Sequence, residues 1–432
     1  MQKYKLGSIA KVEISSVDKK TKEGQKIVRL CNFVDVYHNW AITSKHYDSF
    51  MIASANDREI ESFSIKKGQV ALTKDSETRD DIGISTYIAD DFKDVVLGYH
   101  TALVTPDENI LSGKYLNAIL HTKFAQKYFE NNASGSGMRY TLSLQTLKDF
   151  PIYVPGIKEQ ERVANVFSAI DKKIALNREE NATLEAMAKQ LYDYWFVQFD
   201  FPDANGNPYK SSGGKMVWNE KLKREIPEGW EVSKLSSLLK FNKNGDWGTD
   251  DPTPTNGLEV NCVRGADIVK MDSLPIRYIN SKNTEKLMQG GDLVVEISGG
   301  SPTQATGRVN YISEELLQIY NGKIICSNFC QYLRLKDVTL SEYFYYLWQL
   351  LYDNDNMFHY EGKTSGLKNL QIDTLLTESW YFPPSHIIEK FREVTLKTLR
   401  NRARTIKENK ELTNLRVFLL PLLMNGQVTI KE

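Results

Sequence analysis

The chain has 432 residues, of which 41% are hydrophobic and 25% charged, a composition typical of a soluble folded protein with two to four domains. Its 55 basic residues balance 55 acidic ones, which excludes a globally basic nucleic-acid binder but allows a local basic surface. No run of 18 apolar residues occurs, and the N-terminal segment has no apolar core of a secretory signal, so we expect a cytoplasmic protein.

Residues 1–155 have the pattern of a mixed domain. Short β-type runs such as QVALTKD and TALVTP alternate with turns rich in Gly, Asn and Asp. One amphipathic helix is predicted near 112–130, and an apolar strand that contains proline, IYVP, closes the segment.

A long helix is predicted over 156–200. Apolar residues recur there at alternating steps of four and three, with two asparagines near the middle, which is the pattern of a coiled-coil seam. This seam consists of Val163, Phe167, Ile170, Ile174, Asn177, Asn181, Leu184, Ala188, Leu191 and Trp195. About 37 helical residues would extend about 55 Å. The next segment, 201–225, is rich in Gly, Ser, Pro and Asn and is predicted to be a linker.

The second half repeats the plan of the first. Residues 226–385 contain strand-like runs, a helix near 341–352 and the strand WYFPP, and a second long helix is predicted over 386–432. Lys5–Lys11 resembles Lys234–Lys240 at an offset of 229 residues, and Ser136–Arg139 resembles Ser365–Lys368 at the same offset. Glu180-Asn181 matches Glu408-Asn409 at 228. Collinear matches at a nearly constant offset predict a tandem duplication.

The second long helix is notably basic. Its cationic residues are Lys390, Arg392, Lys397, Arg400, Arg402, Arg404, Lys407 and Lys410. A solvated helix face and a surface for DNA or a partner explain this charge equally well.

No catalytic or metal site is predicted. Gly362-Lys363-Thr364-Ser365 resembles the end of a phosphate-binding loop, but Met357 stands where its first glycine is required. Asp292 and Glu296 are spaced a little like nuclease carboxylates, yet no lysine follows at the required place, so we interpret them as solvated carboxylates at a strand end. The six histidines lack metal-ligand spacing, and the four scattered cysteines are expected to be buried thiols.

Polar, glycine-rich loops recur in both halves instead. They are Ser134–Arg139 in the first half, and Ser298–Arg308 and Gly362–Lys368 in the second. Glycine lets a backbone approach closely, while Ser, Thr, Lys and Arg donate hydrogen bonds to phosphates and base edges. Tight turns with capping polar residues are the alternative, but recurrence in both halves favours DNA contact.

Taken together, these features resemble the specificity (DNA-recognition, S) subunit of type I restriction–modification systems. The resemblance is strongest from Val154 through Glu159-Gln160 to Asp200, and Ile226–Glu231 is similar to the usual start of a target-recognition domain. Two positions depart from the family pattern: Ile387-Ile388 replace the Glu-Gln pair in the second helix, and Arg79 stands where proline is common.

The resemblance implies an α+β protein. Two tandem α/β target-recognition domains, 1–155 and 226–385, would be separated by two long antiparallel coiled-coil helices, 156–200 and 386–432, with pseudo-twofold symmetry. Such a chain would recognise a bipartite, asymmetric target in double-stranded DNA. The helices would set the separation of the half-sites, as dimeric readers place theirs about 34 Å apart.

The resemblance also implies that catalysis takes place in partner subunits. Two methyltransferase subunits would use S-adenosylmethionine, and endonuclease/translocase subunits would use ATP and Mg, so the chain itself would bind no cofactor. Rival interpretations are a fused restriction enzyme, which would need motifs absent here, a coiled-coil scaffold, and an orphan reader that serves a methyltransferase only. The sequence does not distinguish the last of these.

Two sets of site residues follow. We expect Asn181 and Asn409, at equivalent helix positions, to fix the register of the helix pair, with solvent exposure as the alternative. The candidate DNA-binding residues are Lys74, Ser76, Ser136, Gly137, Arg139, Arg264, Gly299, Gly300, Ser301, Thr303, Arg308, Lys363, Thr364, Ser365 and Lys368.

Overall fold

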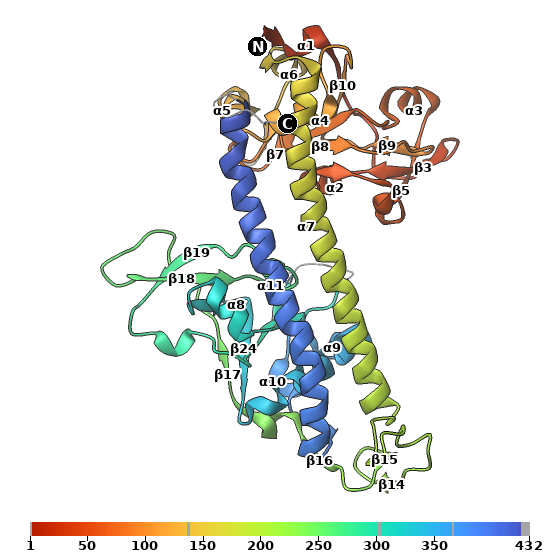
Figure 1. Ribbon diagram of the computed structural model, residues 1–432, viewed down its shortest axis with the longest axis vertical. Coiled ribbons are helices and arrows are strands. Elements are labelled where there is room, and N and C mark those ends of the chain that lie inside the picture. The colour runs from red at the N-terminus through yellow and green to blue at the C-terminus, as the bar shows by residue number, and fades with distance from the viewer. Residues whose placement is uncertain (1, 136–138, 300–303, 365–366, 425–432) are drawn as a thin grey trace. The chain divides into compact units, whose positions relative to one another are not determined.

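The computed structural model of the chain describes residues 2–135, 139–299, 304–364 and 367–424 (Figure 1). Two compact units make up the fold: residues 1–174 with 412–432 form unit 1, and residues 175–411 form unit 2. No helix in these described ranges is long and apolar enough to cross a membrane.

Unit 1 is built on a five-stranded sheet. Its strands, in spatial order, are β2 (Ala10–Ile14), β10 (Thr101–Pro106), β6 (Val70–Thr73), β8 (Ser85–Ile88) and β4 (Ala41–Ile42). Every residue of β6 and β8 is buried, which is why these strands are apolar or hydroxyl-bearing throughout rather than alternating. Three further strands, β5 (Met51–Ala55), β3 (Lys26–Cys31) and β9 (Val95–Leu97), form a second sheet, and β1 (Gln2–Lys5) pairs with β13 (Pro151–Val154).

Two helices cover this sheet where one was predicted. The segment near 112–130 forms α4 (Gly113–Leu120) and α5 (Lys123–Asn132), so the prediction of a single helix is wrong. The break occurs because the Thr122 hydroxyl accepts a hydrogen bond from the backbone N–H of Ala125 and starts a new helix. Gly113 is required at the start of α4, since a Cβ there would lie 1.9 Å from the carbonyl oxygen of Gly68.

Unit 2 repeats the strand order of unit 1. Its main sheet consists of β17 (Leu239–Asn244), β24 (Cys330–Leu335), β20 (Leu293–Glu296) and β22 (Val309–Tyr311). A second sheet consists of β19 (Ile276–Ile279), β18 (Leu258–Val263) and β23 (Ile324–Cys326), and β16 (Glu231–Lys234) pairs with β27 (Ser379–Phe382). The parallel pair β18–β23 corresponds to β3–β9. The predicted duplication is therefore confirmed by topology.

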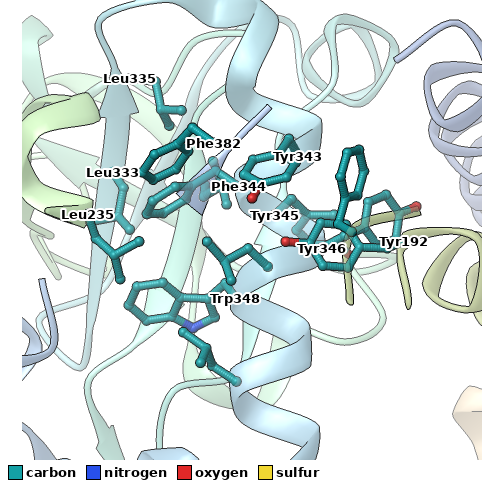
Figure 2. Packing of buried hydrophobic residues seen from close by; sticks show 14 of the residues in the cluster. Tyr192, Leu235, Leu333, Leu335, Tyr343, Phe344, Tyr345, Tyr346, Trp348 and Phe382 are labelled. Carbon is teal, nitrogen blue, oxygen red and sulfur yellow. The ribbon is translucent and has the colours of Figure 1, made fainter. Parts of the chain in front are cut away.

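The core of unit 2 is unusually aromatic. The predicted helix near 341–352 is α9 (Ser341–Asp353), which carries Tyr343, Tyr345, Tyr346 and Trp348 into this core (Figure 2). The hydroxyl groups that enter it differ in their partners: Tyr343 donates to the carbonyl oxygen of Tyr381 at 2.7 Å, whereas the Tyr346 hydroxyl has no hydrogen-bond partner among the described residues. A hydrogen-bond partner offsets the free-energy cost of burying a tyrosine hydroxyl.

The two long helices are α7 (Ile157–Tyr192) and α11 (Ser385–Met424), and each contributes a segment to both units. A short π-helical stretch, Asp193–Val197, follows α7. Segment 201–225, predicted to be the linker, includes β14 (Met216–Asn219), which forms a hairpin with β15 (Arg224–Pro227), and its Phe201 is buried against Trp230.

All four cysteines are free and buried, as predicted, and burial raises the pKa of the Cys262 and Cys330 thiols to about 12. Within the described part of the chain, no group of three His, Cys, Asp or Glu side chains could hold a metal ion.

Candidate nucleic-acid interface

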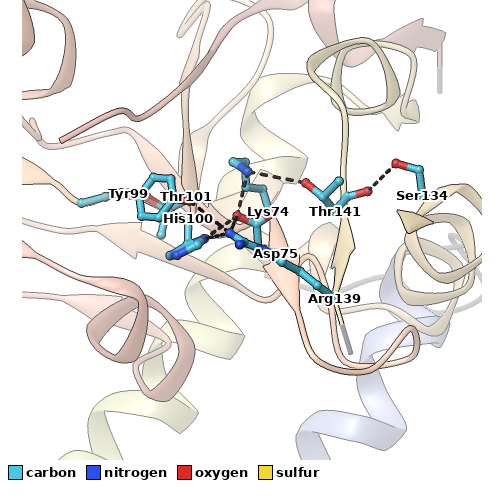
Figure 3. Close-up of polar contacts among 9 residues, drawn as sticks. Lys74, Asp75, Tyr99, His100, Thr101, Ser134, Arg139 and Thr141 are labelled. Atoms are coloured by element: carbon cyan, nitrogen blue, oxygen red, sulfur yellow. Dashed lines mark hydrogen bonds and ion pairs between the residues drawn. The ribbon is translucent and has the colours of Figure 1, made fainter. Parts of the chain in front are cut away.

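A small three-stranded sheet in unit 1 brings together candidate residues that are far apart in sequence. It consists of β11 (Ser134–Gly135), β12 (Tyr140–Thr141) and β7 (Asp75–Ser76). Ser76 lies on β7 and Lys74 immediately precedes it. Arg139 immediately precedes β12, and Figure 3 shows Lys74 and Arg139 close to Asp75. Three of the predicted DNA-binding residues are therefore neighbours.

A buried carboxylate organises this group. Asp75 Oδ2 lies 2.7 Å from Lys74 Nζ, 2.5 Å from His100 Nδ1 and 3.8 Å from an Arg139 guanidinium nitrogen (Figure 3). Burial alone would raise the pKa of Asp75, but hydrogen bonds from Lys74, Thr141 and His100 outweigh it, and the pKa is lowered. The carboxylate therefore stays charged and holds its cationic neighbours in fixed directions.

The cations of this group differ in how far they reach solvent. The Lys74 side chain is only 14% exposed, whereas that of Arg139 is 62% exposed. Arg139 also donates to the Tyr99 hydroxyl at 3.0 Å, which aligns its guanidinium. Arg139 is thus available to a ligand, while Lys74 mainly balances the charge of Asp75.

Unit 2 contains an equivalent three-stranded sheet. It consists of β21 (Ser298–Gly299), β26 (Leu367–Leu370) and β25 (Glu361–Thr364). Gly299, Lys363, Thr364 and Lys368 all lie on it. The structure therefore also gathers the candidate residues of the second half on one small sheet.

Buried carboxylates hold the cations of unit 2 as well. The Arg308 guanidinium donates two hydrogen bonds to Glu296, at 2.8 and 2.6 Å, which raise the pKa of Arg308. Lys368 Nζ lies 3.1 Å from Glu361, which also accepts from the backbone N–H of Thr306 at 2.7 Å. These bidentate and multiple contacts fix the side chains more strongly than a single exposed ion pair would.

Arg264 belongs to the same neighbourhood. It is held by Asp267 through hydrogen bonds of 2.7 and 2.9 Å, and the next residue, Gly265, would place a Cβ 2.9 Å from Glu296 Oε1. The corresponding turn of unit 1 follows β3, where Asp35 accepts from the backbone N–H of Asn32 at 2.8 Å, as Asp267 does from that of Arg264 at 3.0 Å. Sequence reasoning did not single out Asn32, because the capping pattern becomes informative only once β3 and β18 are known to be equivalent.

Six candidates lie outside the described residues: Ser136, Gly137, Gly300, Ser301, Thr303 and Ser365. For the others, the DNA-binding role stays a prediction. The alignment of the two loops changes by one residue, because Ser76 pairs with Tyr140 and Gly299 pairs with Lys368. Leu367, rather than Lys368, is therefore the counterpart of Arg139.

One interpretation of charged residues is wrong. Asp292 and Glu296 are not solvated: both are buried, and Asp292 accepts two 2.7 Å hydrogen bonds from Arg334. On the basic helix, Arg392 donates to buried Glu342 and Arg402 lies 3.9 Å from Glu185, so these two arginines form contacts within unit 2. The other cations include five exposed side chains, those of Lys390, Lys397, Arg400, Arg404 and Lys407. Partners that come from distant strands and helices could not be identified from spacing.

The asparagines of the helix pair make contacts inside unit 2. Asn177 donates to Asn409 at 2.9 Å, and Asn181 accepts from Thr405 at 2.7 Å, so the two helix segments run antiparallel. Asn177 and Thr405 are equivalent in the repeat, as are Asn181 and Asn409, so the duplication exchanges one contact for the other. Asn409 therefore faces Asn177, a seam position that was not proposed as its partner.

We expect Asn177→Ala to lower the free energy of unfolding by about 1–3 kcal/mol, because Asn409 would lose a buried hydrogen-bond partner. The double variant Asn177→Leu/Asn409→Leu should cost less than the sum of the single changes, since an apolar pair needs no partner. Urea unfolding of the wild type, Asn177→Leu, Asn409→Leu and the double variant gives the coupling free energy between the two positions. Strictly additive effects would contradict a role of this pair in register.

Comparison with known proteins identifies the class of this chain. The model of the type I restriction modification DNA specificity domain matches residues 1–186 and again 227–414, so the chain belongs to this family. The two matched segments correspond to the two halves of the duplication.

Named relatives agree with this assignment. The specificity subunit of the type I restriction enzyme MjaIX from Methanocaldococcus jannaschii is 26% identical over 334 residues, which cover 76% of this chain and 72% of that protein. The HindI specificity subunit from Haemophilus influenzae is 22% identical over 423 residues, covering 84% and 87%.

Solved structures include the S subunit of a type I restriction-modification system from M. genitalium. Its TM-score is 0.48 at 14% identity, with 98% of this chain and 95% of that chain covered. The HsdS subunit from Thermoanaerobacter tengcongensis has a TM-score of 0.34 at 13% identity, with 99% and 97% covered.

Proposed function

We propose that this chain recognises a bipartite, asymmetric sequence in double-stranded DNA on behalf of a type I restriction–modification complex. The observation that supports this most directly is the recurrence of one small sheet in both units, each bearing cations held by buried carboxylates. Two equivalent surfaces with different side chains suit two half-sites of different sequence.

The ion pairs bear on how such surfaces would act. A cation neutralised by a carboxylate contributes little net charge for phosphate binding, but its remaining N–H groups point in defined directions. Directional donors of this kind suit base edges in the major groove. The net charge of the chain is zero, which agrees with partner subunits making many of the contacts to DNA phosphates.

In this proposal the chain is not catalytic. The partners are two methyltransferase subunits, which would use S-adenosylmethionine, and endonuclease/translocase subunits, which would use ATP and Mg. Both long helices are the natural docking surface for the methyltransferases, and the chain itself binds no cofactor.

The test is to express the chain with its methyltransferase in a host free of other adenine methylation and to map methylated adenines by sequencing. We expect one interrupted motif with unlike halves. Expression of the methyltransferase alone is the control and should give no such motif. A continuous motif, or methylation that is independent of this chain, would contradict the proposal.

A further inference from the structure

One exposed turn occupies the same place in both small sheets. In unit 1 the backbone N–H of Lys74 donates to the carbonyl oxygen of His100 at 2.9 Å, and in unit 2 that of Ile297 donates to Phe329 at 2.9 Å. Lys74 and Ile297 also accept equivalent bonds, from Leu142 at 2.7 Å and Leu370 at 2.8 Å. His100 and Phe329 are therefore counterparts. His100 immediately precedes β10, and Phe329 immediately precedes β24.

His100 is a polar ring in a constrained position. Its φ of 73° lies in the left-handed region, which non-glycine residues seldom adopt and which is concentrated at functional sites. Asp75 holds its Nδ1 at 2.5 Å, and the ring lies against Tyr99 with centroids 3.6 Å apart. The side chain is 34% exposed, and Nε2 is the ring atom that can then exchange a hydrogen bond with a ligand.

Phe329 is an apolar ring at the corresponding place. It is 55% exposed, although it belongs to a turn fixed by two backbone hydrogen bonds to its own carbonyl oxygen, from Ile297 at 2.9 Å and Ser298 at 3.2 Å. An exposed apolar side chain by itself is ordinary. Its position is informative because its carbonyl oxygen accepts from Ile297 as that of His100 accepts from Lys74, so both residues adjoin the small sheets.

The same contrast recurs at a second position. Arg139, which lies 3.2 Å from His100 Nδ1, corresponds to Leu367, which is 44% exposed. Unit 1 thus presents hydrogen-bonding groups where unit 2 presents apolar ones. In the major groove, hydrogen-bonding side chains discriminate bases by their donors and acceptors, whereas apolar side chains contact the methyl group of thymine.

We propose that His100 and Phe329 are equivalent specificity-determining residues, with His100 contacting a hydrogen-bonding base edge and Phe329 a thymine methyl group. The proposal rests on the proposed function. It explains how one duplicated scaffold recognises two different half-sites: a single position changes its chemistry, while the backbone hydrogen bond that joins its carbonyl oxygen to Lys74 or Ile297 is kept.

The first test maps methylated adenines in the complex that contains His100→Phe or Phe329→His. Each variant is expected to alter the base preference at one or two positions in its own half of the motif and leave the other half unchanged. Phe124→His changes another exposed aromatic residue, on α5, and should leave the motif intact. A motif unchanged in both variants, or changed equally in both halves, would overturn the proposal.

The second test addresses the methyl group directly. DNA duplexes carry the mapped motif with each thymine of one half-site replaced in turn by deoxyuridine, and binding by the complex is measured. Loss of one methyl contact is expected to weaken binding about fourfold at one position of the unit 2 half-site. The effect should vanish in Phe329→Ala.

The outcomes separate the two proposals. If the wild-type complex gives no interrupted motif, the proposed function fails. If the motif is present but no thymine-to-deoxyuridine change is sensitive to Phe329, only the present inference fails. Thermal unfolding of each variant identifies any loss of folding. The Phe329 side chain is exposed enough for substitution to be tolerated, whereas His100→Phe removes a hydrogen-bond partner of buried Asp75.

Discussion

Replacing Trp348 by alanine is expected to lower the free energy of unfolding of unit 2 by about 3–5 kcal/mol. The indole is completely buried in the aromatic core, with Phe344 6.2 Å away between ring centroids (Figure 2). Truncation removes these contacts and leaves a cavity that close-packed neighbours fill only in part. Urea unfolding, followed by near-ultraviolet circular dichroism, measures the loss.

This substitution should also disturb the candidate interface. Trp348 Nε1 donates to the carbonyl oxygen of Gly307 at 2.8 Å, and Tyr352 donates to that of Ala305 at 3.2 Å. Helix α9 therefore holds the segment that carries Arg308. Because Gly307 has a φ of +107°, no other residue adopts this turn without strain.

Trp348→Phe is the matched control for this effect. It keeps most of the ring volume but leaves the Gly307 carbonyl without its donor, so a cost of about 1–3 kcal/mol is expected. If Trp348→Ala proved no more costly than Trp348→Phe, packing of the indole would not be what stabilises unit 2.

Periodicity predicted the helices well, because it reports burial directly. The seam residues Val163, Phe167, Ile170 and Ile174 are all buried, and Asn177 among them is completely so. The amphipathic pattern near 112–130 was equally clear, but periodicity alone does not register a cap such as that of Thr122, which divides the segment into two helices.

The composition of the candidate site could be predicted only in part. Glycine and hydroxyl residues mark the loops, and repetition of the loops in both halves drew attention to them. The carboxylates that organise the cations could not be found this way, since Asp75 meets His100 and Arg139 only through strand pairing. His100 and Phe329 are separated by 229 residues, the offset of the repeat, but only the backbone hydrogen bonds show that both adjoin the small sheets.

Lengthening both long helices is expected to change the spacer between the half-sites. Four residues inserted after Ile174 in α7, and four after Glu411 in α11, fall where each helix passes from one unit to the other. They add about 6 Å to each helix, which corresponds to about two base pairs along DNA. If these helices set the separation, the mapped motif should keep both halves and gain about one to two unspecified base pairs.

Rotation makes the prediction sharper. Four residues turn a helix about 40° beyond a full turn, whereas two base pairs rotate DNA by about 70°, so the two surfaces stay roughly in phase. Seven residues inserted at the same two places preserve the heptad pattern of the seam and leave each helix only about 20° short of two full turns. They add about 10 Å, which corresponds to about three base pairs, and three base pairs rotate DNA by about 105°. The seven-residue insertion should therefore reduce methylation strongly, although it disturbs the helix packing less.

The control is a four-residue insertion after Asn205, in an exposed turn of segment 201–225, which should leave the spacer unchanged. Methylation mapping of the three variants measures both spacer and extent of modification. An unchanged spacer in the four-residue variant that remains active would contradict the role proposed for the helices. Equal activity of the four- and seven-residue variants would show that the helices do not fix the rotation of the two surfaces about the DNA.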